Sequence, residues 1–149
     1  MKFSAEEKRQ LKTASEIIRT KLVHQDVMKN PEFTKKYLIN KLIHEEREVF
    51  SVILLDSQNK IINDCNLFFG TIDRASVYPR EVVKKVLHDN AASVIFAHNH
   101  PSGIPEPSGC DRRITSKLID ALSLIDVKVL DHVVVGGSEA VSFSERGWI

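Results

Sequence analysis

The first third of the chain has apolar side chains at helical spacing. In the first segment they recur every three or four positions, at Leu11, Ala14, Ile18 and Leu22. The preceding Ser4-Ala5-Glu6-Glu7 is a capping-box pattern, which predicts that a helix starts at Ser4. Asn30-Pro31 is a second start signal, with proline in the first helical position. The pattern therefore predicts two helices with charged outer faces before residue 45.

The periodicity changes at Val49. VFSVILLD (49–56) is typical of a buried strand, and the polar residues 57–60 predict a turn into a second strand over about 61–69. Three later segments are also typical of strands: ASVIFAH (92–98), VKVLDHVVVGG (127–137) and EAVSFSE (139–145). Helix starts are predicted at Tyr78-Pro79 and at Ser108. Strands that alternate with helices, together with two hairpins, predict an α/β layered fold with a mixed sheet.

Composition narrows the class of protein. The 149 residues suit one domain, which we divide into an N-terminal helical extension (1–44) and a layered domain (45–149). Lys and Arg number 21 and Asp and Glu 20, so charge gives no reason to expect nucleic-acid binding, although it does not exclude it. The N-terminus has no signal-peptide pattern, and the apolar runs are too short to span a bilayer. Two cysteines do not form a disulfide framework, so we expect a cytoplasmic protein.

The chemistry is concentrated in AHNHPSGIPEPSGCD (97–111), which follows a predicted strand. Side chains two residues apart on a strand share a face, so His98 and His100 can converge while Asn99 points away. Imidazole nitrogens bind zinc, and Asp111 is the natural third ligand, since a proline-stiffened loop can bring the next helix start back to the histidines. Three protein ligands would leave a fourth position for water, as hydrolysis requires.

Other interpretations of the same residues stay open. Ser108 and Asp111 also form a capping-box pattern, and a carboxylate held in a cap is less free to bind metal. A thiolate at Cys110 could bind zinc, although adjacent side chains at a helix start diverge. On a late strand, Asp131 or His132 could orient a ligand histidine, although a histidine satisfied by its own neighbours is the commoner case.

The spacing His98-x-His100-Pro101, six residues, Ser108, two residues, Asp111 matches the JAMM motif, and the chain resembles the JAB/MPN metalloprotease superfamily. Separate strings in matching order resemble its bacterial RadC branch, the UPF0758 group: FFGTIDRASVYPREVVKKVL, AHNHPSGIPEPS, LDHVVVGG and SFSERG. The resemblance covers about residues 31–149. It implies a mixed-sheet JAB/MPN fold with a layout like that of cytidine deaminases. Family members usually carry a preceding helix-hairpin-helix segment, which the first 30 residues do not resemble.

The resemblance also implies the roles of the site residues. It supplies a glutamate two positions before the aromatic residue that opens the first strand, which favours Glu48 over Glu45 and Glu46; without it, all three would be a solvated helix end. His98, His100 and Asp111 would hold one Zn²⁺, and Glu48 would take a proton from the bound water and give one to the leaving amine. Ser108 corresponds to the position whose hydroxyl stabilises the developing oxyanion, a role that conflicts with capping.

We therefore expect a zinc-dependent hydrolase, a metallopeptidase or isopeptidase with a peptide or protein substrate. The principal alternative is a non-catalytic zinc-containing module associated with DNA repair or recombination. A third is nucleic-acid binding through Lys and Arg of the first two helices. Zinc deaminases need both His-x-Glu and Pro-Cys-x-x-Cys, and the second of these patterns is absent. The Gly-x-Ser-x-Gly pattern of α/β-hydrolases is also absent.

Overall fold

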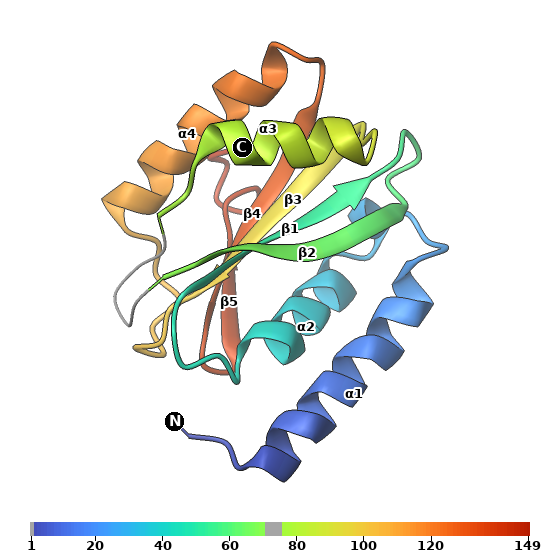
Figure 1. The fold of residues 1–149 in the computed structure, drawn as a ribbon. Coiled ribbons are helices and arrows are strands. Elements are labelled where there is room, and N and C mark those ends of the chain that lie inside the picture. The colour runs from blue at the N-terminus through green and yellow to red at the C-terminus, as the bar shows by residue number, and fades with distance from the viewer. Residues whose placement is uncertain (1, 71–75) are drawn as a thin grey trace.

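A computed structural model describes residues 2–70 and 76–149 of the chain (Figure 1). Residues 71–75, part of one of the RadC-like strings, lie outside the described residues. The helices and strands follow in this order: α1 (Ala5–Leu22), the short 3₁₀ helix η1 (Val27–Lys29), α2 (Pro31–Leu42), β1 (Val49–Leu55), β2 (Ile61–Phe69), α3 (Pro79–His88), β3 (Ser93–Asn99), α4 (Gly109–Ser123), β4 (Lys128–Gly136) and β5 (Glu139–Ser142).

The helix starts lie where the sequence places them. Ser4 caps α1 through a capping box with Glu7, and Pro31 is the first residue of α2. Ser108 caps α4 in the same way, through a second capping box with Asp111. Each box satisfies backbone N–H groups that have no partner within the helix, so these short polar sequences fix where the helices begin.

The described strands form one mixed sheet in the order β2-β1-β3-β4-β5. β1 is antiparallel to both β2 and β3, β3 is parallel to β4, and β4 is antiparallel to β5. The two hairpins and the mixed sheet confirm the predicted α/β class. The order of the strands makes β3 the central strand, and all seven of its residues are buried.

Helices cover both faces of the sheet, with α1 and α2 on one side and α3 and α4 on the other (Figure 1). β1 alternates between the two cores: Val49, Ile53 and Leu55 pack with α2, whereas Phe50, Val52 and Leu54 pack with α3 and α4. Side chains of α2 thus share a core with the sheet. The division of the chain at residue 44 stays a prediction.

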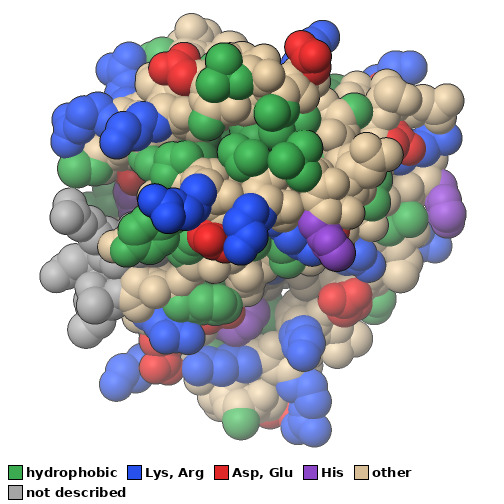
Figure 2. Space-filling view, turned by 45° about the horizontal axis from the view of Figure 1, so that its top comes forward, with side chains coloured by type: hydrophobic (Ala, Val, Ile, Leu, Met, Phe, Trp, Pro, Cys, Tyr) green, Lys and Arg blue, Asp and Glu red, His purple; other side chains and the backbone are tan. Residues whose placement is uncertain are grey.

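On the outer face of α3 and α4, hydrophobic side chains gather among lysines and arginines (Figure 2). Leu87, near the end of α3, and Leu124, directly after α4, are 58% and 86% exposed. Among the helices of the described ranges, none combines the length and apolar character that crossing a membrane requires.

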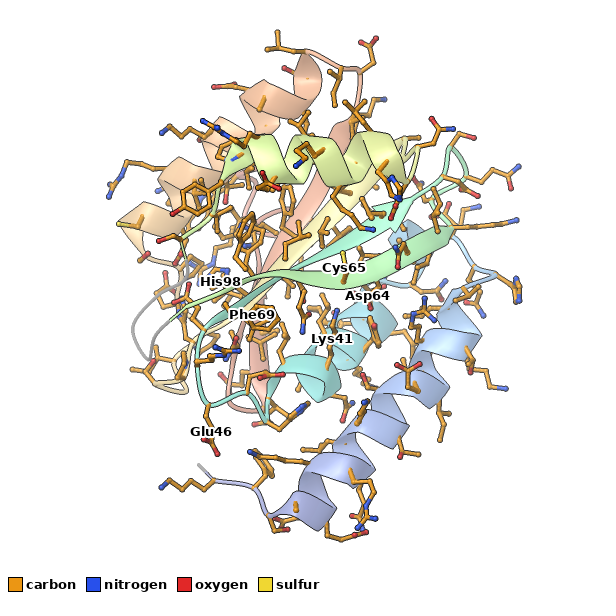
Figure 3. All side chains as sticks on the ribbon, in the orientation of Figure 1. Lys41, Glu46, Asp64, Cys65, Phe69 and His98 are labelled. Carbon is orange, nitrogen blue, oxygen red and sulfur yellow. The ribbon has the colours of Figure 1, made fainter. Side chains whose placement is uncertain are left out.

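A buried ion pair joins α2 to the sheet edge. Lys41 points from α2 towards Asp64 on β2, and its Nζ contacts Oδ1 of Asp64 (Figure 3). The two side chains are 16% and 3% exposed. Burial lowers the pKa of Lys41 to about 8 and raises the pKa of Asp64 to about 7. Both charges are therefore costly to bury, and removal of either one would leave the other buried without its counter-ion.

Lys41→Met should lower the free energy of unfolding by about 3 kcal/mol, because it leaves the Asp64 carboxyl buried without its cation. The double variant Lys41→Met/Asp64→Leu should recover most of the loss, since neither charge is then buried. Urea unfolding measures both. Lys36→Met, an exposed lysine of the same helix, is the control and should change stability by less than about 0.5 kcal/mol. Equal losses in the single and double variants would contradict the pairing.

Candidate metal centre

The structure brings His98, His100 and Asp111 together at the end of β3. His98 is 1% exposed on the face covered by α3 and α4, and His100 follows directly after the last residue of the strand. Asp111 lies in the first turn of α4, at the far end of the proline-containing loop. One ligand atom from each residue can be chosen so that all lie within 4.8 Å of one another. The three residues proposed from the spacing are therefore neighbours in space.

The distances within this group suit one small cation. The Nε2 atoms of His98 and His100 are 3.0 Å apart. Asp111 places Oδ1 at 3.3 Å from Nε2 of His98 and Oδ2 at 3.4 Å from Nε2 of His100. Tetrahedral ligands at zinc-like bond lengths of about 2.0–2.1 Å lie roughly 3.3 Å from each other. The donor atoms already have about that separation.

The loop fixes the neutral ring of His100 in one tautomer. Its Nδ1 lies 2.9 Å from the carbonyl oxygen of Ile104, which can only accept, so Nδ1 carries the proton and Nε2 of the neutral ring has a free lone pair. The loop reaches this position because Gly136 on β4 has no side chain; a Cβ there would lie 2.3 Å from the nitrogen of Pro105. Gly136 is thus needed for close packing of the loop.

Asp111 serves the helix cap and the histidines together. Oδ2 accepts hydrogen bonds from the backbone N–H of Ser108 at 2.6 Å and from its hydroxyl at 2.7 Å. Oδ1 is turned towards His98. Burial raises the pKa of the carboxyl, but its contacts with His100, His98 and Ser108 outweigh burial, so the pKa lies well below its ordinary value. The capping and ligand interpretations are therefore compatible, since Oδ2 serves the cap while also lying near His100, and Oδ1, which faces His98, takes no part in the cap.

Electrostatics at the group favour added positive charge. The contact with Asp111 raises the pKa of His100 above its ordinary value, against the opposing effect of partial burial. The charge of Glu48 raises it further, which places that carboxylate within electrostatic range of the site. The same negative charges would attract a divalent cation.

Glu48 lies where β1 approaches the site. Phe50 pairs with His98 in the antiparallel register, and extending this register two residues past the paired positions would place Glu48 opposite His100. The side chain is 7% exposed. Of the other two glutamates, Glu46 is exposed, points away from the sheet and pairs with Lys8 at 3.0 Å (Figure 3). Glu45 is partly exposed near His44.

Asn99 holds the segment that carries Glu48, a role that the sequence analysis missed. It points to the opposite face, as predicted, where Oδ1 accepts from the N–H of Val49 at 2.8 Å. Its Nδ2 donates to the carbonyl of Arg47 at 3.0 Å and more weakly to that of Glu45 at 3.4 Å. One buried amide thus fixes the backbone on both sides of Glu48. The alternation that turns Asn99 away from the histidines was the available signal.

His132 and Thr115 lie behind His98; the sequence had offered His132 or Asp131 as a residue that orients a ligand histidine, whereas Thr115 was not considered. Nε2 of His132 is 2.8 Å from Nδ1 of His98, and its Nδ1 is 2.6 Å from the hydroxyl of Thr115. Complete burial lowers the pKa of His132 well below its ordinary value, and the neighbouring His98 lowers it further, so the ring of His132 is neutral. Asp131 instead accepts hydrogen bonds from Ser142, Ser144 and the N–H of His132.

Two further residues lie beside the group without joining it. The Ser108 hydroxyl accepts from the N–H of Asp111 and donates to its carboxylate, so both of its hydrogen-bonding functions serve the cap. Cys110 is exposed, and its Sγ lies 3.0 Å from a guanidinium nitrogen of Arg113. Within the described residues, the group of possible metal ligands does not include Cys110.

Comparison with known proteins places most of the chain in one family. A model of the RadC-like JAB domain matches residues 28–148. The UPF0758 protein VP0184 of Vibrio parahaemolyticus is 59% identical over 124 residues, which cover 83% of this chain and 55% of that protein. A UPF0758 protein of Vibrio cholerae is 57% identical over 145 residues, covering 97% of this chain and 91% of that protein. The chain thus spans about half the length of several curated relatives that it matches, and most of another.

Asn99→Ala should lower the free energy of unfolding by about 2–3 kcal/mol, because it leaves buried backbone groups beside Glu48 without partners. In the variant, the amide hydrogen of Val49 should exchange with solvent faster than in the wild type, by a larger factor than the other amide hydrogens of β1. Asn40→Ala is the matched control, since the Asn40 side chain bonds only to the Lys36 carbonyl of its own helix. Unchanged exchange at Val49 would contradict the role assigned to Asn99.

Proposed function

The chain belongs to the RadC-like JAB domain family, and we propose that it is a zinc-dependent hydrolase that cleaves an amide bond in a peptide or protein. The family and the α/β fold were both expected from the sequence. The possible metal-binding group His98, His100 and Asp111 supports the metal part of the proposal. The hydrolase activity, the zinc and the catalytic residues are the proposal itself.

The observation that carries the proposal is the geometry of the three ligand side chains. Two imidazole Nε2 atoms lie 3.0 Å apart beside one ionised carboxylate, an arrangement that a proton or a cation between them would stabilise. Two histidines and a carboxylate are a ligand set that zinc accepts, with a fourth position left for water. When bound, zinc would polarise a substrate carbonyl and lower the pKa of a water molecule.

In this proposal Glu48 is the general base and then the general acid. It would take a proton from the attacking water as the water oxygen bonds to the carbonyl carbon, and would then give that proton to the amine nitrogen as the amide C–N bond breaks. Its buried position opposite His100 is the structural support for this role. Ser108 would stabilise the developing oxyanion, for which its hydroxyl must rotate away from Asp111.

The proposal includes a cytoplasmic location, where the free thiols of Cys65 and Cys110 would stay reduced. It concerns the activity of this domain, since several relatives are nearly twice its matched length. The alternative is a zinc-containing module of DNA repair or recombination that lacks turnover. On the first two helices several lysines and arginines are paired with acids, for example Lys35 with Glu32 and Glu145. Paired cations are less available to bind the phosphates of DNA, which favours a peptide or protein substrate.

Zinc should raise the melting temperature of the metal-free protein, because a ligand that binds only the folded state at about 100 times its Kd adds roughly 2.7 kcal/mol of stability. Asp111→Asn should remove most of this shift while keeping the helix cap, since the N-cap Ser108 is unchanged and the asparagine amide oxygen can still accept from its N–H. Thermal unfolding with and without zinc measures the effect. Asp120→Asn, an exposed acid of the same helix, should retain the full shift. An equal shift in both variants would exclude Asp111 as a ligand.

Glu48→Gln should lower amide hydrolysis by at least about 100-fold without lowering zinc content, because only proton transfer is removed. The assay uses the zinc-loaded chain with a mixture of peptides cut from whole-cell protein, and mass spectrometry counts the new N-termini. Glu46→Gln, a surface acid two residues away, should cleave like the wild type.

The hydrolase and the non-catalytic zinc-containing module predict different results in this assay. Full turnover in Glu48→Gln would refute the assignment of Glu48. A wild-type protein that holds one equivalent of zinc but forms no new N-termini, from peptides or from isopeptide-linked conjugates, would support the non-catalytic module.

A further inference from the structure

Behind His98, a line of hydrogen-bonding groups runs from the strand to the first turn of α4. The Thr115 hydroxyl lies 2.6 Å from the carbonyl oxygen of Asp111 and 2.6 Å from Nδ1 of His132. Nε2 of His132 lies 2.8 Å from Nδ1 of His98. Thr115, His132 and His98 are 2%, 0% and 1% exposed, so water does not compete for these contacts.

The donor and acceptor in each of these hydrogen bonds can be assigned by starting from the Asp111 carbonyl. The carbonyl of Asp111 can only accept, so a 2.6 Å contact requires Thr115 to donate its single hydroxyl proton there. The Thr115 oxygen must then accept from Nδ1–H of His132. A neutral imidazole has one N–H, so Nε2 of His132 is bare and accepts from Nδ1–H of His98. The remaining nitrogen, Nε2 of His98, carries a free lone pair facing His100 and Asp111.

We propose that Thr115 and His132 are positioning residues that hold His98 in the tautomer whose Nε2 can bind metal. The proposal deepens the metal site proposed above and rests on it. The relay begins at the backbone of Asp111 and ends at the ring of His98, so one ligand residue sets the protonation form of another through two buried side chains.

Aromatic rings pack around His132 and restrict the position of its imidazole. Its ring stacks on Phe143 with centroids 4.8 Å apart, and Phe50 and Phe96 meet it at steep angles of 72° and 74°. Trp148 packs edge-on against Phe143 at 5.1 Å. The aromatic rings prevent His132 from rotating away, so its nitrogens stay aligned with Thr115 and His98.

His100 reaches the same tautomer by an independent route, since its Nδ1–H donates to the carbonyl of Ile104. Both histidines therefore direct a bare Nε2 to one point, although one is set by a loop carbonyl and the other by a side-chain relay. An accidental pair of neighbouring histidines would have no reason to share this protonation form.

The test uses two measurements on the full chain. Long-range ¹H–¹⁵N correlation spectra of the metal-free protein report histidine tautomers directly, and His98, His100 and His132 should all be protonated at Nδ1. Zinc affinity is measured by competition with a chromophoric chelator. Thr115→Val keeps the side-chain shape but removes the hydroxyl, so His98 should lose its single tautomer and zinc should bind about 10–100-fold more weakly.

Two matched variants separate positioning from structure. Thr115→Ser restores the hydroxyl and should recover both the tautomer and the affinity. Thr34→Val makes the same change at another buried helical threonine, whose hydroxyl bonds to the Asn30 carbonyl, and should alter neither readout.

Several results would overturn the proposal. One is a wild-type His98 whose proton is on Nε2 and not on Nδ1, a result that needs no variant to fold and no hydrolase activity. Another is weaker zinc binding in Thr115→Val without a change of tautomer, since that indicates a purely structural effect. A changed tautomer with unchanged affinity would equally refute it. Absent turnover with the predicted tautomers and affinities would count against the hydrolase alone.

Discussion

The site depends on a constraint at the centre of the sheet, where β3 is buried along its whole length. Polar side chains at the buried end of such a strand must find partners within the protein, because water cannot supply them. His98 and Asn99 meet this requirement on opposite faces, one through His132 and the other through the backbone around Glu48. The hydrogen bonds that satisfy the polar groups at the end of β3 thus have a second effect. They orient the proposed ligand His98 and anchor the segment that carries the proposed base, Glu48.

The elements of the fold could be predicted because their signals are local. Capping boxes, an N-terminal proline and the change from helical to strand periodicity lie within a few residues of the boundaries that they set. The order of the strands could not be predicted, because it depends on which hydrophobic faces meet. The Lys41–Asp64 pair joins residues 23 positions apart, and neither residue stands out from other charged residues in the sequence. Its buried position emerges only when α2 packs against the sheet edge.

The candidate site was predictable in part for the same reason. The spacing of His98, His100 and Asp111 is a local pattern, and the structure brings the three together. The sequence could not show whether Asp111 caps the helix or faces the histidines, because that depends on where each carboxylate oxygen points. Thr115 escaped notice because a threonine beside the apolar face of a helix resembles an ordinary boundary residue. Its position one turn after Asp111 acquires meaning only when His132 of β4 lies against it.

The arrangement also explains how a site can be rigid before any ion binds. The loop carbonyl of Ile104, the capping contacts of Ser108 and the buried ring of His132 each fix one ligand side chain. When protein contacts already order the ligands, little binding free energy is needed to order them, and more of it remains as affinity. The C-terminal residues contribute to this order, since Trp148 supports Phe143 and Phe143 supports His132. The final turn of the chain therefore supports the candidate metal centre through packed rings, with Trp148 edge-on to Phe143 and Phe143 stacked on His132.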